Sequence, residues 1–139
     1  MRLLEPRHLN RLQALHSRLV EDLLELAHGG HQDALDAIIG MLEDLVQQGL
    51  KSRYALALKS TPLWELKTRA RGGPKGGARV YWFPLEVAFE DREDTETFAV
   101  VVSAEVKAES TPNPFKLAEA LEIYFAFKYD AQTMIRSST

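Results

Sequence analysis

The sequence predicts an α+β fold in which two N-terminal helices pack on an antiparallel β-meander that is followed by a C-terminal helix. Three observations predict it. Apolar residues recur at steps of three and four within residues 8–48, period-two patterning follows within residues 54–107, and helical spacing returns over residues 113–128. The 139 residues are 45% hydrophobic, which is enough material for one core, so we expect a single domain spanning 1–139.

Each N-terminal helix is predicted by its own apolar stripe. The first stripe, within residues 8–27, consists of Leu9, Leu12, Leu15, Leu19, Leu23 and Leu26. The second consists of Leu35, Ile38, Ile39, Leu42, Leu45 and Val46. Gly29-Gly30 and Gly49 suit the helix ends, because glycine adopts a left-handed C-cap conformation without steric cost. We expect both stripes to face inward, so that the helices form a hairpin or lie side by side on a sheet.

Period-two alternation predicts three strands, within residues 63–71, 79–87 and 97–107, and their short connections indicate an antiparallel meander. Residues 54–59 could add a short edge strand. Pro112-Asn113-Pro114 then predicts the start of the last helix, with Asn113 as N-cap and Pro114 at the first helical position. We expect this helix to end near residue 128 and the last residues, 135–139, to form a frayed tail.

Positive charge is concentrated in residues 51–79, which hold eight Lys or Arg against one Glu, whereas residues 1–50 hold four against eight acids and residues 80–139 five against eleven. Such segregation favours a polyanion or an acidic protein as partner. The absence of cysteine excludes a disulfide framework and a thiolate zinc site. No run approaches the roughly 18 apolar residues of a membrane span, and no signal peptide is evident, so we expect a soluble cytoplasmic protein.

Several short motifs follow the predicted elements in order. They are Gly49, Lys59, Leu63-Trp64-Glu65-Leu66-Lys67, Arg79-Val80-Tyr81, Lys107 and Pro114-Phe115-Lys116-Leu117-Ala118. With these motifs the chain resembles the RelE/HigB-like toxin superfamily (RelE/ParE fold), including its phage-derived members. The resemblance implies a toxin–antitoxin type endoribonuclease that needs no metal or cofactor and cuts translated mRNA at the ribosome. A cognate antitoxin protein would hold it inactive by covering the basic face.

Cleavage of this kind needs a base for the 2′-hydroxyl, an acid for the leaving oxygen, and cations for the charge that develops on the phosphate. The resemblance and the residue types suggest four catalytic candidates, Arg79, Lys67, Tyr81 and Lys107. Four further cations are candidates for RNA binding, Arg69, Arg71, Lys75 and Lys128. Arg79 is the leading candidate, because a guanidinium matches phosphate oxygens bidentately and keeps its charge.

Other interpretations stay open for the same residues. The alternation of Lys67, Arg69 and Arg71 is equally typical of a solvated strand face. Tyr81 suits the core better than a base-stacking role, and Glu65 suits an ion pair better than the role of general base. All four histidines lie in the N-terminal region, which leaves few acid–base groups. The alternative is therefore a non-catalytic RelE/ParE-fold protein that binds a protein target, as gyrase-type inhibitors do, or a degenerate non-toxic member.

Overall fold

The computed structural model describes residues 1–4, 18–68, 77–89, 91, 93–107, 112–129 and 134–135. The helices are α1 (Leu19–His28), α2 (Gln32–Gln48), the 3₁₀ turn η3 (Gly49–Lys51) and α3 (Pro114–Tyr129). The strands are β1 (Arg2–Leu3), β2 (Ala55–Ala57), β3 (Trp64–Lys67), β4 (Ala78–Phe89), β5 (Thr95–Val106) and β6 (Met134–Ile135). None of these helices has both the length and the apolar character that crossing a membrane requires.

The strands form one six-stranded sheet of order β1-β5-β4-β3-β2, with β6 paired to β4. The pairs β2–β3, β3–β4 and β4–β5 are antiparallel, which confirms the predicted meander and its short edge strand. Two additions were not predicted, because β1 pairs with β5 and β6 pairs with β4, both in parallel. Ile135, expected in a frayed tail, therefore belongs to a strand.

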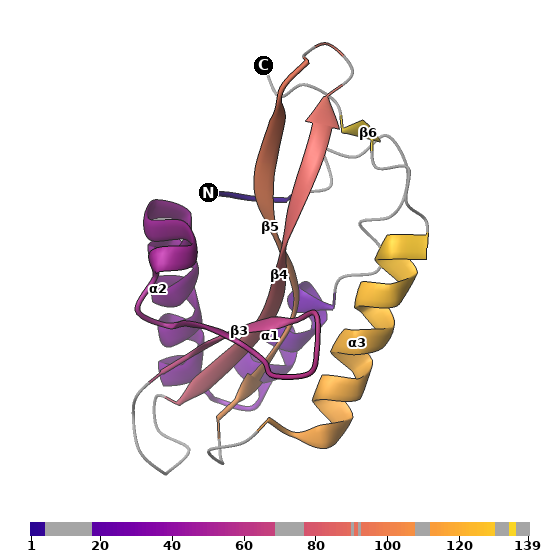
Figure 1. The fold of residues 1–139 in the computed structure, drawn as a ribbon. Helices are drawn as coiled ribbons and strands as arrows, with labels where there is room; N and C mark the ends of the chain where they lie inside the picture. Colours follow the sequence, from indigo (N-terminus) through magenta and orange to yellow (C-terminus); the bar gives the residue numbers. More distant parts are fainter. Residues whose placement is uncertain are drawn as a thin grey trace.

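Helices cover both faces of the sheet (Figure 1). α1 and α2 pack on one face against Val80, Trp82 and their neighbours, and α3 packs on the other against Tyr81 and Phe83. Consecutive residues of β4 thus alternate between two cores, as the period of a strand requires. The predicted α+β class is confirmed, with the helices divided between the two faces.

The predicted helix ends are confirmed where the structure describes them. Gly30 and Gly49 follow α1 and α2 with φ of 77° and 61°, in the left-handed region that glycine tolerates. The side-chain Oδ1 of Asn113 accepts the backbone N–H groups of Phe115 and Lys116 at 2.9 and 3.3 Å, so Asn113 caps α3. α1 begins at Leu19, and the expected helical residues before position 18 lie outside the described part of the chain.

The expectation that the whole apolar stripe of α2 faces inward is wrong for two residues. Ile38, Met41 and Leu45 are buried against the sheet, but the side chains of Ile39 and Val46 are exposed. Successive helical residues are about 100° apart, so neighbours such as Ile38 and Ile39 cannot both point at one flat sheet. α2 therefore carries apolar residues on a second, outward face.

A β-bulge interrupts β5 at Val102. Tyr81 lies opposite Ser103, whereas Trp82 lies opposite Val101, so the register shifts by one residue between them. Val102 is the extra residue on β5. Directly opposite residues of an antiparallel pair point to the same face. Every residue of β5 after the bulge therefore points to the face opposite the one it would occupy in a strand without the bulge.

The bulge decides which side chain meets Arg79. In the observed register Arg79 lies opposite Glu105. Without the bulge, the register that pairs Trp82 with Val101 would continue along both strands. Arg79 would then lie opposite Ala104, and Glu105 would point toward α1 and α2. The bulge thus brings a carboxylate to the face that α3 covers.

Candidate functional site

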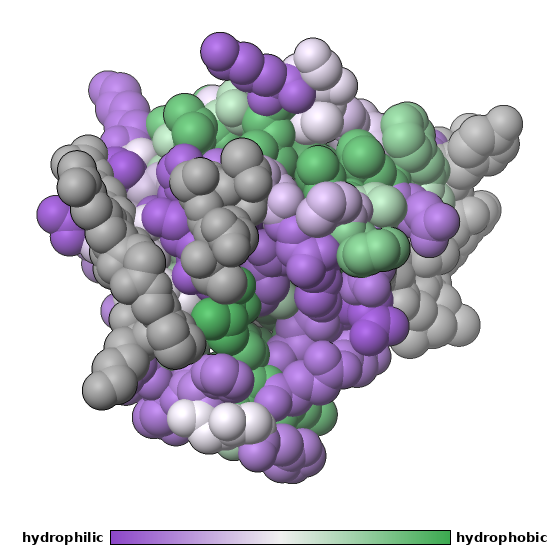
Figure 2. All heavy atoms as spheres, turned by 90° about the horizontal axis from the view of Figure 1, so that it is seen from below, coloured by the Kyte–Doolittle hydropathy of each residue, from purple (hydrophilic) through white to green (hydrophobic). Residues whose placement is uncertain are grey.

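Polar side chains gather at the end of the sheet where β3 and β5 finish and β4 and α3 begin, the lower end in Figure 1. We call this group the arginine cluster, and its members on the α3 face are Glu65, Lys67, Arg79, Tyr81, Ser103 and Glu105. Figure 2 looks onto this end, where hydrophilic side chains surround smaller hydrophobic areas. Three adjacent strands supply the cluster, so its geometry depends on the sheet register.

Arg79 lies at the centre of the arginine cluster and is 1% exposed. Its Nε donates to Glu65 Oε2 at 2.8 Å, and its Nη1 donates to Glu105 Oε1 at 3.1 Å. Lys67 Nζ lies 3.6 Å from Glu65 Oε1, and its side chain is 33% exposed. One guanidinium therefore ties β3, β4 and β5 together, and Glu65 is confirmed as an ion-pair partner.

Burial shifts the acid–base behaviour of two members of the cluster. It raises the pKa of Glu105, although hydrogen bonds from Arg79 and from the backbone N–H of Asn113 oppose the shift. Burial also raises the pKa of Tyr81, and the nearby carboxyl of Glu105 adds to this. The Tyr81 hydroxyl therefore keeps its proton at neutral pH. Ser103 Oγ, on the same face, has no hydrogen-bond partner within the described residues.

Lys107 lies at the open edge of the arginine cluster, directly after β5. Its Nζ donates to the carbonyl oxygen of Thr68 at 2.9 Å. Partial burial lowers the pKa of Lys107, and the charges of Lys67 and Arg79 lower it further. Like charges so close together destabilise the ammonium form and attract an anion.

The structure brings some of the predicted site residues together and separates others. The four catalytic candidates Arg79, Lys67, Tyr81 and Lys107 lie in or beside the cluster, but Arg79 and Tyr81 are closed off from solvent. Lys128 is exposed near the far end of α3, with Nζ 5.8 Å from the ring of Tyr124. The remaining candidates Arg69, Arg71 and Lys75 lie outside the described residues.

Two buried carboxylates of this region, Glu105 and Asp22, were not predicted from the sequence as site residues. Asp22 is 2% exposed on α1, where it accepts the backbone N–H of Ala104 at 3.0 Å and Lys116 Nζ at 2.5 Å. These bonds tie α1 and α3 to β5 directly beside the bulge. The sequence does hold a signal for Asp22, because it lies three residues after Leu19 on the apolar stripe of its helix.

Residues at the start of α1 also make hydrogen bonds to the backbone groups of the bulge. Arg18, just before α1, donates its N–H to the carbonyl oxygen of Val102 at 2.8 Å. The N–H of Ala104 goes to Asp22, as described above. The start of α1 thus completes the hydrogen bonds of β5 where this strand has no β1 residue beside it.

Comparison with known proteins yields no match among protein-family models, curated proteins or solved structures. In chemical terms, Arg79 and its two carboxylates act as a closed structural unit, whereas Lys67 and Lys107 present positive charge at the surface beside it. Among the described residues, no group of three His, Cys, Asp or Glu side chains is placed to hold a metal ion.

Proposed function

We propose that this chain is a RelE/ParE-type protein that acts by binding an acidic protein target, and that Arg79 is structural. The observation that carries the proposal is the closed state of Arg79, which is 1% exposed and hydrogen-bonded to both Glu65 and Glu105. The family part of the proposal comes from the resemblance of the short motifs, such as Leu63-Trp64-Glu65-Leu66-Lys67, to the RelE/HigB-like superfamily.

The energetics of the arginine cluster argue against Arg79 as a phosphate ligand. To reach a phosphate, the guanidinium would have to leave Glu65 and Glu105 in a buried environment. Breaking a buried ion pair in this way costs about 3–5 kcal/mol. Tyr81 is equally unsuited to proton transfer with RNA, because it is fully buried and its pKa is raised.

The binding surface in this proposal is the cationic end of the sheet, which we define by Lys67 and Lys107. Both side chains are partly exposed, and the charge of Lys67 helps to lower the pKa of Lys107. An acidic surface would relieve that repulsion and would be attracted over several ångströms. The resemblance supplies one candidate target, gyrase, which ParE-like toxins inhibit.

The second candidate function is an mRNA endoribonuclease that acts on translated mRNA at the ribosome and is held inactive by an antitoxin. The lowered pKa of Lys107 favours it, because such an ammonium gives up its proton more readily and could act as general acid. In this case Lys67 and Lys107, and not Arg79, would carry the chemistry. A degenerate non-toxic member would show neither activity.

Primer extension on a defined mRNA during cell-free translation separates these functions. The variants are Lys107→Ala and Lys67→Ala, with Lys128→Ala as the matched exposed control. A binding protein gives no discrete cuts with any variant. Cuts from the wild type that disappear with Lys107→Ala and persist with Lys128→Ala would overturn the binding proposal in favour of the nuclease.

Two further experiments complete the test. One is a supercoiling assay with purified gyrase. The other captures binding partners on immobilised wild-type protein and on the double variant Lys67→Ala/Lys107→Ala. We expect one protein to be retained by the wild type and lost with the double variant. Retention that is equal for both proteins would remove the cationic end from the binding surface. Arg79→Ala is unsuitable here, because it leaves the buried carboxyl groups of Glu65 and Glu105 without their cation. A loss of binding could then not be distinguished from a loss of folding.

A further inference from the structure

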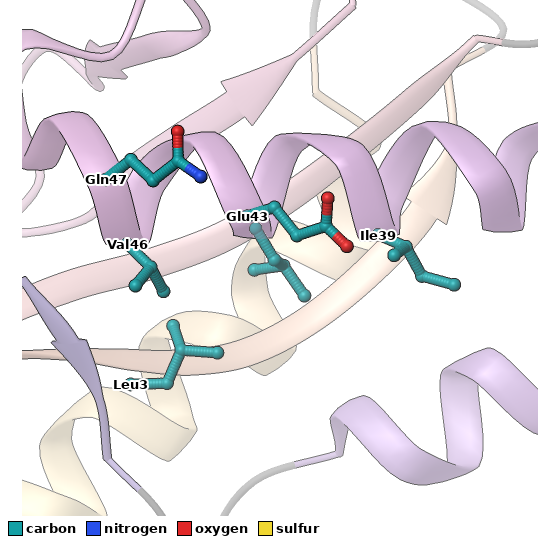
Figure 3. A pocket seen from close by; sticks show the side chains of 6 residues that line it. Leu3, Ile39, Glu43, Val46 and Gln47 are labelled. Carbon is teal, nitrogen blue, oxygen red and sulfur yellow. The ribbon is translucent and has the colours of Figure 1, made fainter.

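An apolar hollow of about 300 Å³ lies between the outward face of α2 and β1 (Figure 3). Its lining residues are Leu3, Ile39, Leu42, Glu43, Val46 and Gln47. This volume is at the lower limit of sites that hold small ligands or the side chains of a partner. The hollow is on the α1–α2 side of the sheet, so it is separate from the arginine cluster.

The walls of the hollow come from two elements that the fold holds side by side. One wall is formed by three residues of α2 at the spacing i, i+3 and i+7, namely Ile39, Leu42 and Val46. Leu3 extends toward them from β1 and forms the other wall (Figure 3). Ile39 is 52% exposed and Val46 is 38% exposed. A stripe with this spacing, faced by an opposite wall, is the shape that accepts one side of an amphipathic helix.

Main-chain hydrogen bonds fix β1 beside α2. The amino group of Met1 donates to the carbonyl oxygen of Val46 at 2.9 Å. The N–H of Leu4 donates to Ala99 of β5 at 2.8 Å. Both walls are therefore in place before a partner arrives, which reduces the entropy lost on binding.

The described charged side chains at the hollow are acidic, and the amino group of Met1, bonded to the carbonyl oxygen of Val46, is a positive group beside them. Glu43 lines the hollow and is exposed, and no lysine or arginine is among the lining residues that the structure describes. The exposed Asp36 lies one helical turn before Ile39 on α2. An apolar stripe with acidic neighbours complements a helix that carries leucine-like side chains flanked by lysine or arginine, and it repels an acidic helix or an anionic lipid surface.

We propose that this hollow is a docking groove for a cationic amphipathic helix of a partner protein. Apolar side chains of that helix fill the space between α2 and Leu3, and its basic side chains pair with Glu43. The groove acts independently of the cationic end of the sheet, so the proposal stands whether the protein binds an acidic target or cuts RNA.

The test measures binding of labelled peptides to the full chain by fluorescence anisotropy. The probe is a leucine–lysine peptide of about 15 residues at helical spacing, which is long enough to form a helix. A leucine–glutamate peptide of the same pattern is the matched probe of opposite charge. We expect the lysine peptide to bind, with an affinity that falls as salt is raised, and the glutamate peptide not to bind.

Variants locate the binding on the molecule. Val46→Asp places a charge in the groove and Glu43→Lys reverses its rim, and each should weaken binding of the lysine peptide at least about tenfold. The matched controls are Phe115→Asp and Glu122→Lys, which make the same changes at exposed positions of α3. All four positions are solvent-exposed, and a circular dichroism melt verifies that each variant is folded.

Two results would overturn the proposal. One is equal affinity of the lysine peptide for Val46→Asp and Phe115→Asp. The other is absence of binding to the wild type at peptide concentrations of about 1 mM, the weak limit of useful recognition.

Discussion

Arg79 shows how the context of a residue decides its role. The same guanidinium that suits a phosphate in chemical terms is here shared between Glu65 and Glu105, in a site with 1% exposure. Two carboxyl partners on neighbouring strands use the fork geometry of arginine, which lysine cannot reproduce. Arginine at this position is thus explained by the joining of three strands.

The first prediction concerns the removal of that guanidinium. Arg79→Ala leaves two buried carboxyl groups without their cation and should lower the free energy of unfolding by about 3–5 kcal/mol. Arg79→Lys should recover only part of this loss, because a single ammonium cannot make the two directed bonds. Urea titration followed by circular dichroism measures both effects, with Lys128→Ala as the exposed control. A loss below about 0.5 kcal/mol for Arg79→Ala would contradict the structural role.

The second prediction follows from the raised pKa of Glu105. The folded protein holds this proton more tightly than the unfolded chain does. The stability that Glu105 contributes is therefore fully present below its unfolded pKa, near 4.5, and is lost as the pH rises through its folded pKa. Glu105→Gln has no proton to lose at this site.

Glu105→Gln should accordingly lose less stability than the wild type between about pH 4.5 and about pH 7.5. Urea midpoints at the two pH values give the comparison. Glu122→Gln, at an exposed position on α3, is the control that removes a carboxyl without changing a buried site. If both variants showed the pH dependence of the wild type, Glu105 would not be the group responsible.

At the scale of elements, α1 does more than cover the sheet. Its start donates the N–H of Arg18 to Val102, and its Asp22 accepts the N–H of Ala104, so it completes the hydrogen bonding of the bulge in β5. The bulge in turn places Glu105 opposite Arg79. A helix on one face of the sheet thereby stabilises a polar cluster on the other face.

The third prediction tests this link. Asp22→Ala removes the acceptor of the Ala104 N–H and leaves Lys116 only the carboxylate of Glu119 at 3.6 Å among its described ion pairs, so it should lower the free energy of unfolding by about 1–3 kcal/mol. Hydrogen exchange should show a faster amide at Ala104, and the pKa of Glu105, followed by NMR, should move because the bulge is loosened. Asp33→Ala, at an exposed position on α2, is the matched control. An unchanged exchange rate at Ala104 would separate α1 from the bulge.

For the whole molecule, one sheet serves two cores, so neither helical layer is expected to unfold alone. On the α3 side, Phe83 packs with its ring centroid 4.8 Å from that of Tyr124 and 5.8 Å from that of Phe127. On the other side, the rings of Trp64 and Trp82 lie 5.5 Å apart. Tryptophan fluorescence thus reports on the α1–α2 side, away from Phe83.

The fourth prediction is that damage to one core is felt in the other. Phe83→Ala should cost about 3–5 kcal/mol. The unfolding midpoint should fall equally by tryptophan fluorescence and by far-UV circular dichroism, as two-state unfolding requires. Phe115→Ala, at a site that is 86% exposed, is the control. Separate midpoints for the two signals would mean that α3 unfolds independently.

Local signals determined much of the fold in advance. The stripe of α1, the period-two runs of β3, β4 and β5, and the cap at Asn113 each depend on a few neighbouring residues, and each appears in the structure. Glu65 could also be anticipated as an ion-pair partner, because it is the single acid among the cations of residues 51–79. Within the site, the sequence therefore identified Arg79, Lys67 and Tyr81 as neighbours but not their surroundings.

Only the tertiary structure decided which of these residues reach solvent. A bulge at Val102 moves Glu105 to the face of Arg79, and the pairing that creates it joins residues far apart in the chain. The outward position of Val46 likewise depends on how α2 is rotated on the sheet. Strand register and helix rotation are set by the balance of packing and hydrogen bonding over the whole domain, and a short motif contains neither.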